Sequence, residues 1–482
     1  MFLDLLFYPN TTIVSLLLVF TGSIIGLFLI PSNSYNLFRT YSLLVSLIPL
    51  LWSVWFFMLY DASGQTFQLL CHIPMIHLSL GIDAVGLSLV LLTSFIFPIC
   101  IMLMRTSAGI LTMLLLELII LGSLLILDLL TFYIFFESSL ILLYLLIARP
   151  DKLTNIQYVK HSISNYSTID AAYKIVLYTM VGSLLFLPVI FILYSNCGST
   201  NLLLLICSNN PTFNVSQQMF LGCGLFAIFA IKIPLIPVHL WLPEAHVSAP
   251  TGGSVLLAGV LLKLGGIGII RFLIPILPVF VIKIFPIIVV MCILSFLFST
   301  LSTIRQIDLK KIVAYSSIAH MSLVTFTIFS MSEHSVASST FMMVAHGLVS
   351  PALFLLVGYL YERSGTKYLP YLKGLGSHMP IFAILFFILT LANLSFPLFP
   401  NFIAEVLCLL SLFAVHSLYS YVFCISQVLA AIYGFWTFNR IMHGYNSILL
   451  KNVLITDLTR REFSIILPLI ILIFWLGLKP IL

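Results

Sequence analysis

Long apolar runs separated by short polar segments repeat along the whole chain. Fourteen of these runs approach the roughly 20 residues that a helix needs to cross the hydrocarbon core of a bilayer. They lie near residues 12–30, 42–60, 81–104, 108–127, 129–147, 173–194, 217–242, 254–273, 279–300, 311–330, 336–361, 380–409, 411–437 and 463–479. The pattern predicts an all-α polytopic membrane protein with about 14 transmembrane helices.

Composition supports this class of protein and argues against bound cofactors. Of the 482 residues, 61% are hydrophobic and only 7% are charged, whereas soluble domains are typically about a quarter charged. The eight cysteines are scattered without a C-x-x-C pair, so they give no support for a metal site or a disulfide framework. The chain also lacks a Gly-rich nucleotide fingerprint. We therefore expect no flavin, nicotinamide, haem, iron–sulfur or metal centre in this chain.

The basic residues alternate between loops and so predict an orientation. Sixteen of the 21 Lys and Arg residues fall in odd-numbered loops, and Arg271, Lys283 and Lys479 fall in even-numbered loops or at an end. Lys232 and Lys263 lie within spans. By the positive-inside tendency both termini face outward. The sixteen are Arg39, Arg105, Arg149, Lys152, Lys160, Lys174, Arg305, Lys310, Lys311, Arg363, Lys367, Lys373, Arg440, Lys451, Arg460 and Arg461.

Two spans carry Pro-x-x-Pro in mid-membrane, at Pro234 and Pro237 and again at Pro397 and Pro400. Proline removes a backbone donor and breaks a helix, which lipid tolerates only where neighbouring groups or water satisfy the backbone. Paired interrupted helices in corresponding halves indicate an inverted-repeat transporter core. The longest polar stretch, residues 148–174, is interpreted as a solvated linker on the inner side.

Several ionisable residues lie at membrane depth, where a charge is disfavoured by about 2.5–3.5 kcal/mol. They are Glu137, Lys232, Lys263, His320, His346 and Glu405. For any one of them, the alternative to a functional role is a structural ion pair or a side chain that snorkels to the membrane surface. For a lone histidine, this structural role is the stronger interpretation. A lysine beside a glutamate is held charged until the carboxylate's charge is withdrawn, so Glu137, Lys232 and Lys263 suit proton transfer.

Three polar residues follow Lys232 in the segment that holds the first pair of prolines. His239 lies about two helical turns after Lys232 and would share its face if the helix continued; a histidine there could relay protons. Pro243 is expected to end that helix. Glu244 and His246 would then be boundary residues, equally consistent with capping and with function.

Three segments resemble the antiporter-like membrane subunits of respiratory complex I, a family shared with multi-subunit sodium/proton antiporters, and more narrowly its chain 4 branch. They read "FFESSLILLYLLI", "IKIPLIPVHLWLPEAHVSAPTGGSVLLAGVLLKLGGIGIIRF" and "RQIDLKKIVAYSSIAHMSLV". The resemblance implies fourteen helices with two inverted five-helix repeats and a broken helix in each half. It implies domains at 1–107, 108–273 (first half-channel), 279–437 (second half-channel) and 438–482.

The resemblance also implies roles for the buried ionisable residues. Glu137 and Lys232 would form a coupled pair, Lys263 would link the two half-channels, and His320 and His346 would continue the path to Glu405. Sister subunits usually carry lysine in place of Glu405, while chain 4 carries glutamate. This chain departs from the pattern at "SFPLFPNF", where relatives usually have glycine after the first proline.

The leading hypothesis is a proton-translocating core membrane subunit of respiratory complex I, coupled to NADH:ubiquinone electron transfer. NADH, flavin, iron–sulfur clusters and ubiquinone would bind partner subunits, and the partners would be neighbouring membrane-arm subunits, accessory subunits and lipids, not nucleic acid. The alternative is a subunit of a secondary sodium/proton antiporter. Abundant Phe, with 40 residues, fits an organelle genome and favours the mitochondrial inner membrane, with both termini on the intermembrane-space side and basic loops in the matrix.

Overall fold

The computed structural model describes residues 12–27, 30, 34–61, 67–73, 78–148, 161–207, 213–445 and 456–480. Within these residues, 12 helices are long and apolar enough to cross a membrane. The predicted multi-pass membrane fold is therefore confirmed. The chain forms two compact units: the first comprises Met1–Lys232, Ser248–Gly253 and Ile267–Lys283, and the second comprises Ile233–Val247, Ser254–Gly266 and Ile284–Leu482.

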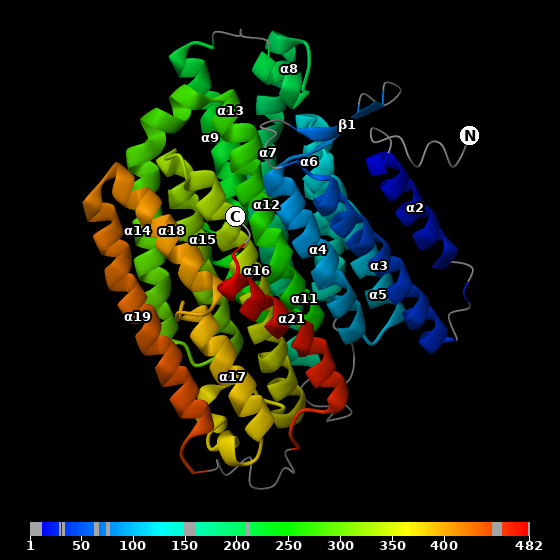
Figure 1. Ribbon diagram of the computed structural model, residues 1–482, viewed down its shortest axis with the longest axis vertical. Coiled ribbons are helices and arrows are strands. Elements are labelled where there is room, and N and C mark those ends of the chain that lie inside the picture. Colours follow the sequence, from blue (N-terminus) through cyan, green and yellow to red (C-terminus); the bar gives the residue numbers. More distant parts are fainter. Residues whose placement is uncertain are drawn as a thin grey trace. The chain divides into compact units, whose positions relative to one another are not determined.

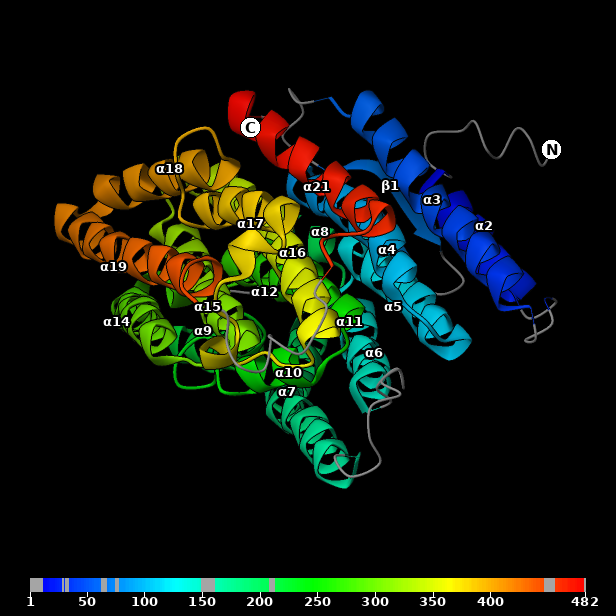
Figure 2. The ribbon, with the colours of Figure 1, turned by 90° about the horizontal axis from the view of Figure 1, so that it is seen from below.

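The first unit is a bundle of apolar helices in which consecutive helices pack on one another, as α3, α4 and α5 do in Figure 2. Local capping fixes where two of them begin: the side chains of Asp83 and Thr106 accept from backbone N–H groups in the first turns of α4 and α5. The long helices are α2 (Thr12–Gly26), α3 (Tyr35–Leu59), α4 (Ala84–Leu103), α5 (Ser107–Leu125), α6 (Leu129–Ala148), α7 (His161–Cys197) and α9 (Val215–Lys232).

Helix α7 begins inside the stretch predicted as a solvated linker. Residues 149–160 of that stretch lie outside the described residues, as do the basic residues Arg149, Lys152 and Lys160. From His161 onward the chain is helical. The prediction of a linker up to residue 174 is therefore wrong for its second half, because helix propagation continues beyond the apolar span into polar sequence.

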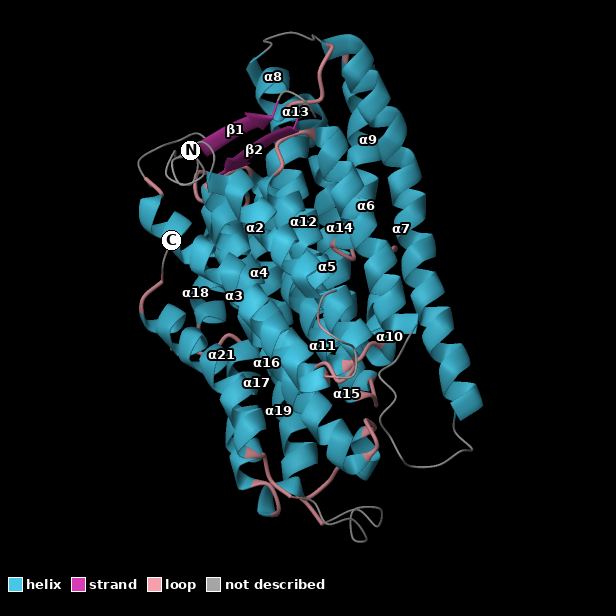
Figure 3. Ribbon diagram, turned by 90° about the vertical axis from the view of Figure 1, so that its right-hand side faces the viewer, coloured by secondary structure: helices cyan, strands magenta, loops and turns pink. Residues whose placement is uncertain are grey.

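A small antiparallel hairpin, which the hydropathy pattern does not predict, lies at one end of the first unit (Figure 3). Its strands are β1 (Gln68–Ile73) and β2 (Leu78–Ile82). Bridges from Leu80 to Ile126 and from Asp128 to Asn201 join this end to the α5–α6 junction and to α8 (Leu202–Cys207). Short apolar strands next to a span read as part of the span, which is why the sequence pattern misses them.

Arg271 is buried in this unit, although the sequence pattern places it in an outer loop. It is 3% exposed and lies in the π-helix η4 (Ile269–Leu273). Its guanidinium forms an ion pair with Asp83 and donates to the carbonyl oxygens of Leu124 (2.7 Å) and Ile126 (3.2 Å). The prediction is wrong because a charge at the end of a span can be satisfied by neighbouring carbonyls as well as by water.

The second unit holds most of the remaining helices. Helices α15 and α16 are buried along nearly their whole length, so they form its core, and α18, α19 and α21 pack around them or one another (Figure 1). The helices are α10 (Trp241–Ser248), η3 (Leu257–Leu261), α12 (Leu262–Gly268), α14 (Pro278–Arg305), α15 (Leu309–Ser330), α16 (Ser335–Ser364), η5 (Leu369–Tyr371), η6 (Leu375–Ser377), α17 (Pro380–Asn393), α18 (Pro400–Val415), α19 (Ser417–Met442) and α21 (Arg460–Leu478). Helices α11 (Thr251–Leu256) and α13 (Ile274–Ile276) complete the run from Thr251 to Ile276, whose parts belong to both units.

Both predicted helix breaks are present. Helix α9 ends at Lys232 and α10 begins at Trp241, with turns between them. Helix α17 ends at Asn393 and α18 begins at Pro400. Turn hydrogen bonds satisfy part of the freed backbone, for example Val238 N to Leu235 O at 2.8 Å in the first break. The breaks are thus local unwindings within otherwise helical spans.

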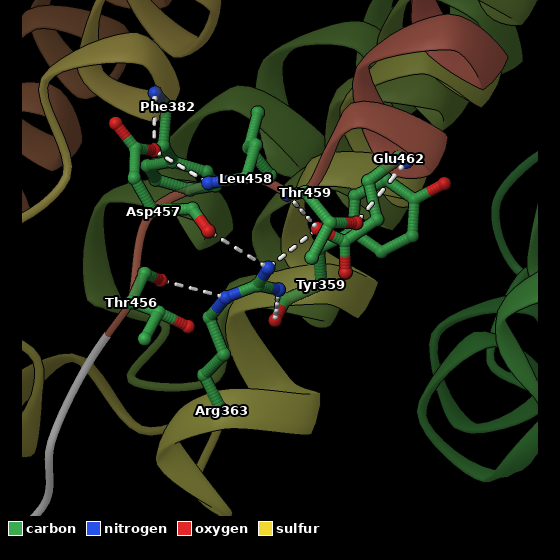
Figure 4. A network of polar contacts seen from close by, with 8 residues as sticks. All are labelled: Tyr359, Arg363, Phe382, Thr456, Asp457, Leu458, Thr459 and Glu462. Atoms are coloured by element: carbon green, nitrogen blue, oxygen red, sulfur yellow. Dashed lines mark hydrogen bonds and ion pairs between the residues drawn. The ribbon is translucent and has the colours of Figure 1, made fainter.

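Arg363 ties together three helix ends at one end of the second unit (Figure 4). From the end of α16 it pairs with Glu462 at the start of α21, and it donates to the carbonyl oxygens of Thr456 and Asp457. The Asp457 carboxylate accepts from the backbone N–H groups of Ile381 and Phe382 at the start of α17. Arg363 and Asp457 therefore link the end of α16 to the starts of α17 and α21.

Candidate functional site

Lys263 lies in an irregular helical run that contains two π-helices. It is 1% exposed and sits in α12, which is flanked by the π-helices η3 and η4. A π-bulge shifts the hydrogen-bond register of a helix and leaves a carbonyl free, and such bulges are frequent at functional sites. The Nζ atom of Lys263 donates to the carbonyl oxygen of Ala258 in η3. The bulge thus provides a partner for a cation at membrane depth.

His346 of α16 is the second partner of Lys263. The distance from Lys263 Nζ to His346 Nδ1 is 3.0 Å, and His346 Nε2 lies 3.1 Å from the Ser317 hydroxyl of α15. The Ser317 hydroxyl itself donates to the carbonyl oxygen of Val313. This pattern fits a neutral imidazole that accepts from Lys263 at Nδ1 and donates to Ser317 from Nε2. One proton can therefore be shared between Lys263 and His346.

His320 and Glu405 extend the row. The imidazoles of His346 and His320 have their centroids 5.4 Å apart, and His320 Nδ1 lies 3.1 Å from Glu405 Oε1. That distance suits an ion pair, although the alignment is not that of a hydrogen bond. All four side chains are nearly completely buried. A proton can cross between the two rings when one ring turns or when a water molecule bridges them.

Glu137 and Lys232 lie together in the first unit. Lys232 is buried, its Nζ lies 4.2 Å from the centroid of the Phe136 ring, and its charge interacts with that of Glu137. One oxygen of the Glu137 carboxylate is buried without a hydrogen-bond partner among the described residues. Lys232 and Glu137 are thus near enough for their charges to interact, and an aromatic face shields the ammonium group.

The first break separates Lys232 from His239, so the condition for a shared helix face is not met. Helix α9 ends at Lys232, and His239 lies in the turns before α10. Its ring packs against Phe298 and Tyr315, with centroids 5.6 and 6.4 Å away. A break at the proline-containing segment, which the sequence also predicts, excludes a shared helix face.

The boundary residues after the first break belong to a separate short helix. Pro243 lies in the first turn of α10, where proline is tolerated, so the prediction that it ends a helix is wrong. Glu244 is in the same first turn, which suits an acidic side chain near a helix N-terminus. His246 is completely buried and stacks on Phe354, with centroids 4.3 Å apart. Glu244 thus fits a helix-start role, whereas His246 remains a candidate for proton transfer.

Glu117 is a buried carboxylate of the first unit that was not among the residues predicted from the sequence. It lies on α5, is 0% exposed, and neither of its oxygens has a hydrogen-bond partner among the described residues. A lone glutamate in an apolar span is the same signal that identifies Glu137. That signal was present in the sequence, and Glu117 belongs with the candidate residues.

Metal chemistry has no candidate site in the part of the chain that the structure describes: no group of three or more His, Cys, Asp or Glu residues there could hold an ion. The absence of a bound cofactor from this chain stays a prediction. What the arrangement offers is a set of groups that can take up and release protons.

Comparisons with known proteins identify the family. Residues 127–431 match the family model described as NADH:quinone oxidoreductase/Mrp antiporter, TM. NADH-ubiquinone oxidoreductase chain 4 of Chlamydomonas reinhardtii is 57% identical over 94% of this chain and 96% of its own length. The same chain of Arabidopsis thaliana is 40% identical over 95% and 92%.

Two solved structures share the fold. A chain of respiratory complex I from Thermus thermophilus with bound NADH has a TM-score of 0.82 and 24% identity, covering 96% of each chain. A chain of the Mrp complex from Dietzia sp. DQ12-45-1b has a TM-score of 0.83 and 17% identity, covering 96% of this chain and 94% of that chain. The fold is thus common to complex I and Mrp complexes, while the sequence is chain-4-like throughout. The chain belongs to the NADH-ubiquinone oxidoreductase chain 4 family.

Proposed function

We propose that this chain conducts protons across the membrane as a core subunit of respiratory complex I. The observation that carries the proposal is the buried row Lys263–His346–His320–Glu405, in which neighbouring polar atoms lie 3.0 Å apart at one end and 3.1 Å apart at the other. Burying four ionisable groups in one place is unfavourable unless they are paired, and histidine serves such a row because it titrates near neutral pH.

The direction of transfer along the row follows from charge. When Lys263 is protonated, its Nζ donates to His346, and a proton that moves to Nδ1 makes an imidazolium. Its other proton, on Nε2, faces the Ser317 hydroxyl, so it reaches His320 when the ring turns or when a water molecule bridges the two rings. Glu405 attracts positive charge to His320 at the far end. Glu137 and Lys232 supply a second pair in the first unit, and withdrawing the Glu137 charge would release a proton from Lys232.

Complex I family membership supports a partnership with other membrane-arm subunits and lipids, with NADH, flavin, iron–sulfur clusters and ubiquinone held by other subunits. We further propose the mitochondrial inner membrane as its location. The grouping of basic residues at one end of the second unit, including Arg363 and Lys367, supports basic loops in the matrix and termini on the intermembrane-space side.

The test compares Lys263→Met with Lys283→Met in the assembled complex. Lys283 lies on α14 and is exposed, so it controls for the loss of one positive charge. We expect Lys263→Met to assemble, to oxidise NADH slowly and to lose proton pumping, and Lys283→Met to match the wild type. Wild-type pumping in an assembled Lys263→Met complex would exclude the row as a proton path.

A native gel of the source membranes separates the proposal from a sodium/proton antiporter. Co-migration of the chain with an NADH-oxidising band supports a complex I subunit. Migration in a smaller assembly, together with sodium-dependent proton flux, would overturn it.

A further inference from the structure

Asn401 is a buried amide in the first turn of α18, next to the second helix break. It is 0% exposed, and neither its Nδ2 nor its Oδ1 atom has a hydrogen-bond partner among the described residues. Burying an amide without a partner is unfavourable, and protein interiors rarely leave such a group unsatisfied. An apolar side chain of the same size would avoid this loss, so the amide itself requires an explanation.

Asn401 shares a helix face with Glu405, four residues later. The Glu405 carboxylate lies 3.1 Å from Nδ1 of His320 on α15, and the Cys408 thiol lies 4.0 Å from the hydroxyl of Thr327 on the same helix. Helices α15 and α18 therefore run in the same direction along this contact. The buried side chains of α18 have the spacing of one face turned toward the bundle: Pro400, Asn401, Ala404, Glu405, Cys408, Ser411 and Leu412.

The shared direction places Asn401 beside the gap in the buried row. On α15, Ser317 lies one turn before His320. On α18, Asn401 lies one turn before Glu405, so it is on the same side of the His320–Glu405 pair as Ser317. Because Ser317 contacts Nε2 of His346, this is the side where the row passes from His346 to His320. The two imidazole centroids are 5.4 Å apart there.

The unpartnered atoms at this place match the hydrogen-bonding capacity of water. Among the described residues, both nitrogens of His320 and the Oε1 atom of Glu405 have no hydrogen-bond partner, as is true of both polar atoms of Asn401. All three side chains are buried. A buried water molecule typically makes about three hydrogen bonds to polar groups of this kind. The asparagine amide offers it both a donor and an acceptor.

We propose that Asn401 is a positioning residue that holds an ordered water molecule beside His320, and that this water bridges the gap between His346 and His320. The inference rests on the proposed function. The water accepts a proton from the imidazolium of His346 and donates another of its protons to His320. The water is thereby regenerated, His346 becomes neutral and His320 becomes the imidazolium. Asn401 neither gains nor loses a proton.

The first test is a cryo-electron-microscopy map of the assembled complex at a resolution that shows ordered water. We expect a water peak within hydrogen-bonding distance of the Asn401 amide and of a His320 nitrogen, and we expect Asn401→Leu to lack it. A wild-type map without a peak beside the Asn401 amide would overturn the inference.

The second test measures proton pumping in assembled complexes. Asn401→Leu preserves the size of the side chain and removes its donor and acceptor, so pumping should slow roughly tenfold, as expected from losing a hydrogen bond to a charged group. Asn401→Ser keeps a hydroxyl and leaves room for the water, so it should recover most of the rate, a rescue that a purely structural role does not predict. The control is Ser411→Ala. Ser411 lies on the same face, but its hydroxyl already donates to the Cys408 carbonyl oxygen at 2.7 Å, so this variant should pump normally.

The outcomes separate the two proposals. If Lys263→Met pumps like the wild type, the proposed function fails, and the role of Asn401 fails with it. If Lys263→Met stops pumping while assembled Asn401→Leu pumps at the wild-type rate, the role of Asn401 alone is refuted. Equal losses in Asn401→Leu and Asn401→Ser would also refute it. Should Asn401→Leu fail to assemble, the map of Asn401→Ser decides: a water peak beside the serine hydroxyl is expected, and its absence would overturn the inference.

Discussion

The 3.0 Å separation of Lys263 Nζ and His346 Nδ1 makes a quantitative prediction possible. If both groups carried a proton, their charges would repel by about 5.5 kcal/mol at an effective dielectric constant near 20. That energy corresponds to roughly a ten-thousandfold disfavoured state. Lys263 and His346 therefore hold at most one extra proton between them, so a proton that arrives at one group is accepted only if the other releases its own.

Replacing His346 with Gln preserves a polar side chain of similar size but removes the proton acceptor. Because a positioned acid or base typically contributes a factor of about 10²–10⁴ to proton transfer, we expect NADH-driven pumping in assembled complexes to fall by roughly a hundredfold or more. Pumping is measured by dye quenching in sealed inverted membrane vesicles, with a native gel to verify assembly.

The matched control is His334→Gln. His334 is the residue just before α16, the helix that holds His346. Its side chain is exposed and makes no hydrogen bond with the first turn of that helix, so this variant should pump normally. If His346→Gln assembles and pumps at the wild-type rate, protons do not pass through His346 and the reasoning from the Lys263–His346 distance is wrong.

Three further predictions concern stability and pH. Arg271→Met should lower the free energy of unfolding by about 2–3 kcal/mol, because it leaves two buried carbonyl oxygens and the partly exposed Asp83 carboxylate without their partner; heat-induced loss of the folded chain measures this. Leu398 has φ +87°, a left-handed backbone conformation that glycine adopts without strain, so Leu398→Gly should stabilise the chain by about 1 kcal/mol. Burial, and then the charge of Lys311, lower the pKa of Lys367 from its ordinary value of 10.5, against the opposing effect of Asp308. Between the pKa of Lys367 in the folded chain and 10.5, the unfolded chain therefore binds more protons at Lys367 than the folded chain does. The contribution of Lys367 to the free energy of unfolding thus rises with pH across that window. Lys367→Gln should remove this rise in thermal melts recorded against pH.

Controls for these three predictions are available in the chain. Arg305→Met removes an exposed charge and should leave stability within about 0.5 kcal/mol; equal losses for Arg271→Met and Arg305→Met would contradict the role of the buried pair. Leu398→Ala keeps a Cβ and should bring no gain, so a gain equal to that of glycine would show that backbone strain is not the cause. A melting profile of Lys367→Gln that follows the wild type at every pH would refute the assignment to Lys367.

The amino-acid sequence alone determined the membrane class, the two broken helices and most of the ionisable residues at membrane depth. Hydropathy reports how apolar a segment is, and a charged side chain in such a segment stands out without knowledge of its neighbours. The prolines at 234 and 397 likewise act through local backbone chemistry. For the same reason Glu117 was within reach of the sequence, since its signal equals that of Glu137.

Only the tertiary structure decided which of these residues meet. In lipid, the face toward the bundle and the face toward the bilayer are both apolar, so a span carries little periodic signal of its inner side. The contact of Lys263 with His346, 83 residues away, depends on helix rotation and on the π-bulges beside Lys263, and neither is encoded in hydropathy. The burial of Arg271 against Asp83 and the hairpin before α4 were decided in the same way, by hydrogen-bond partners distant in the chain.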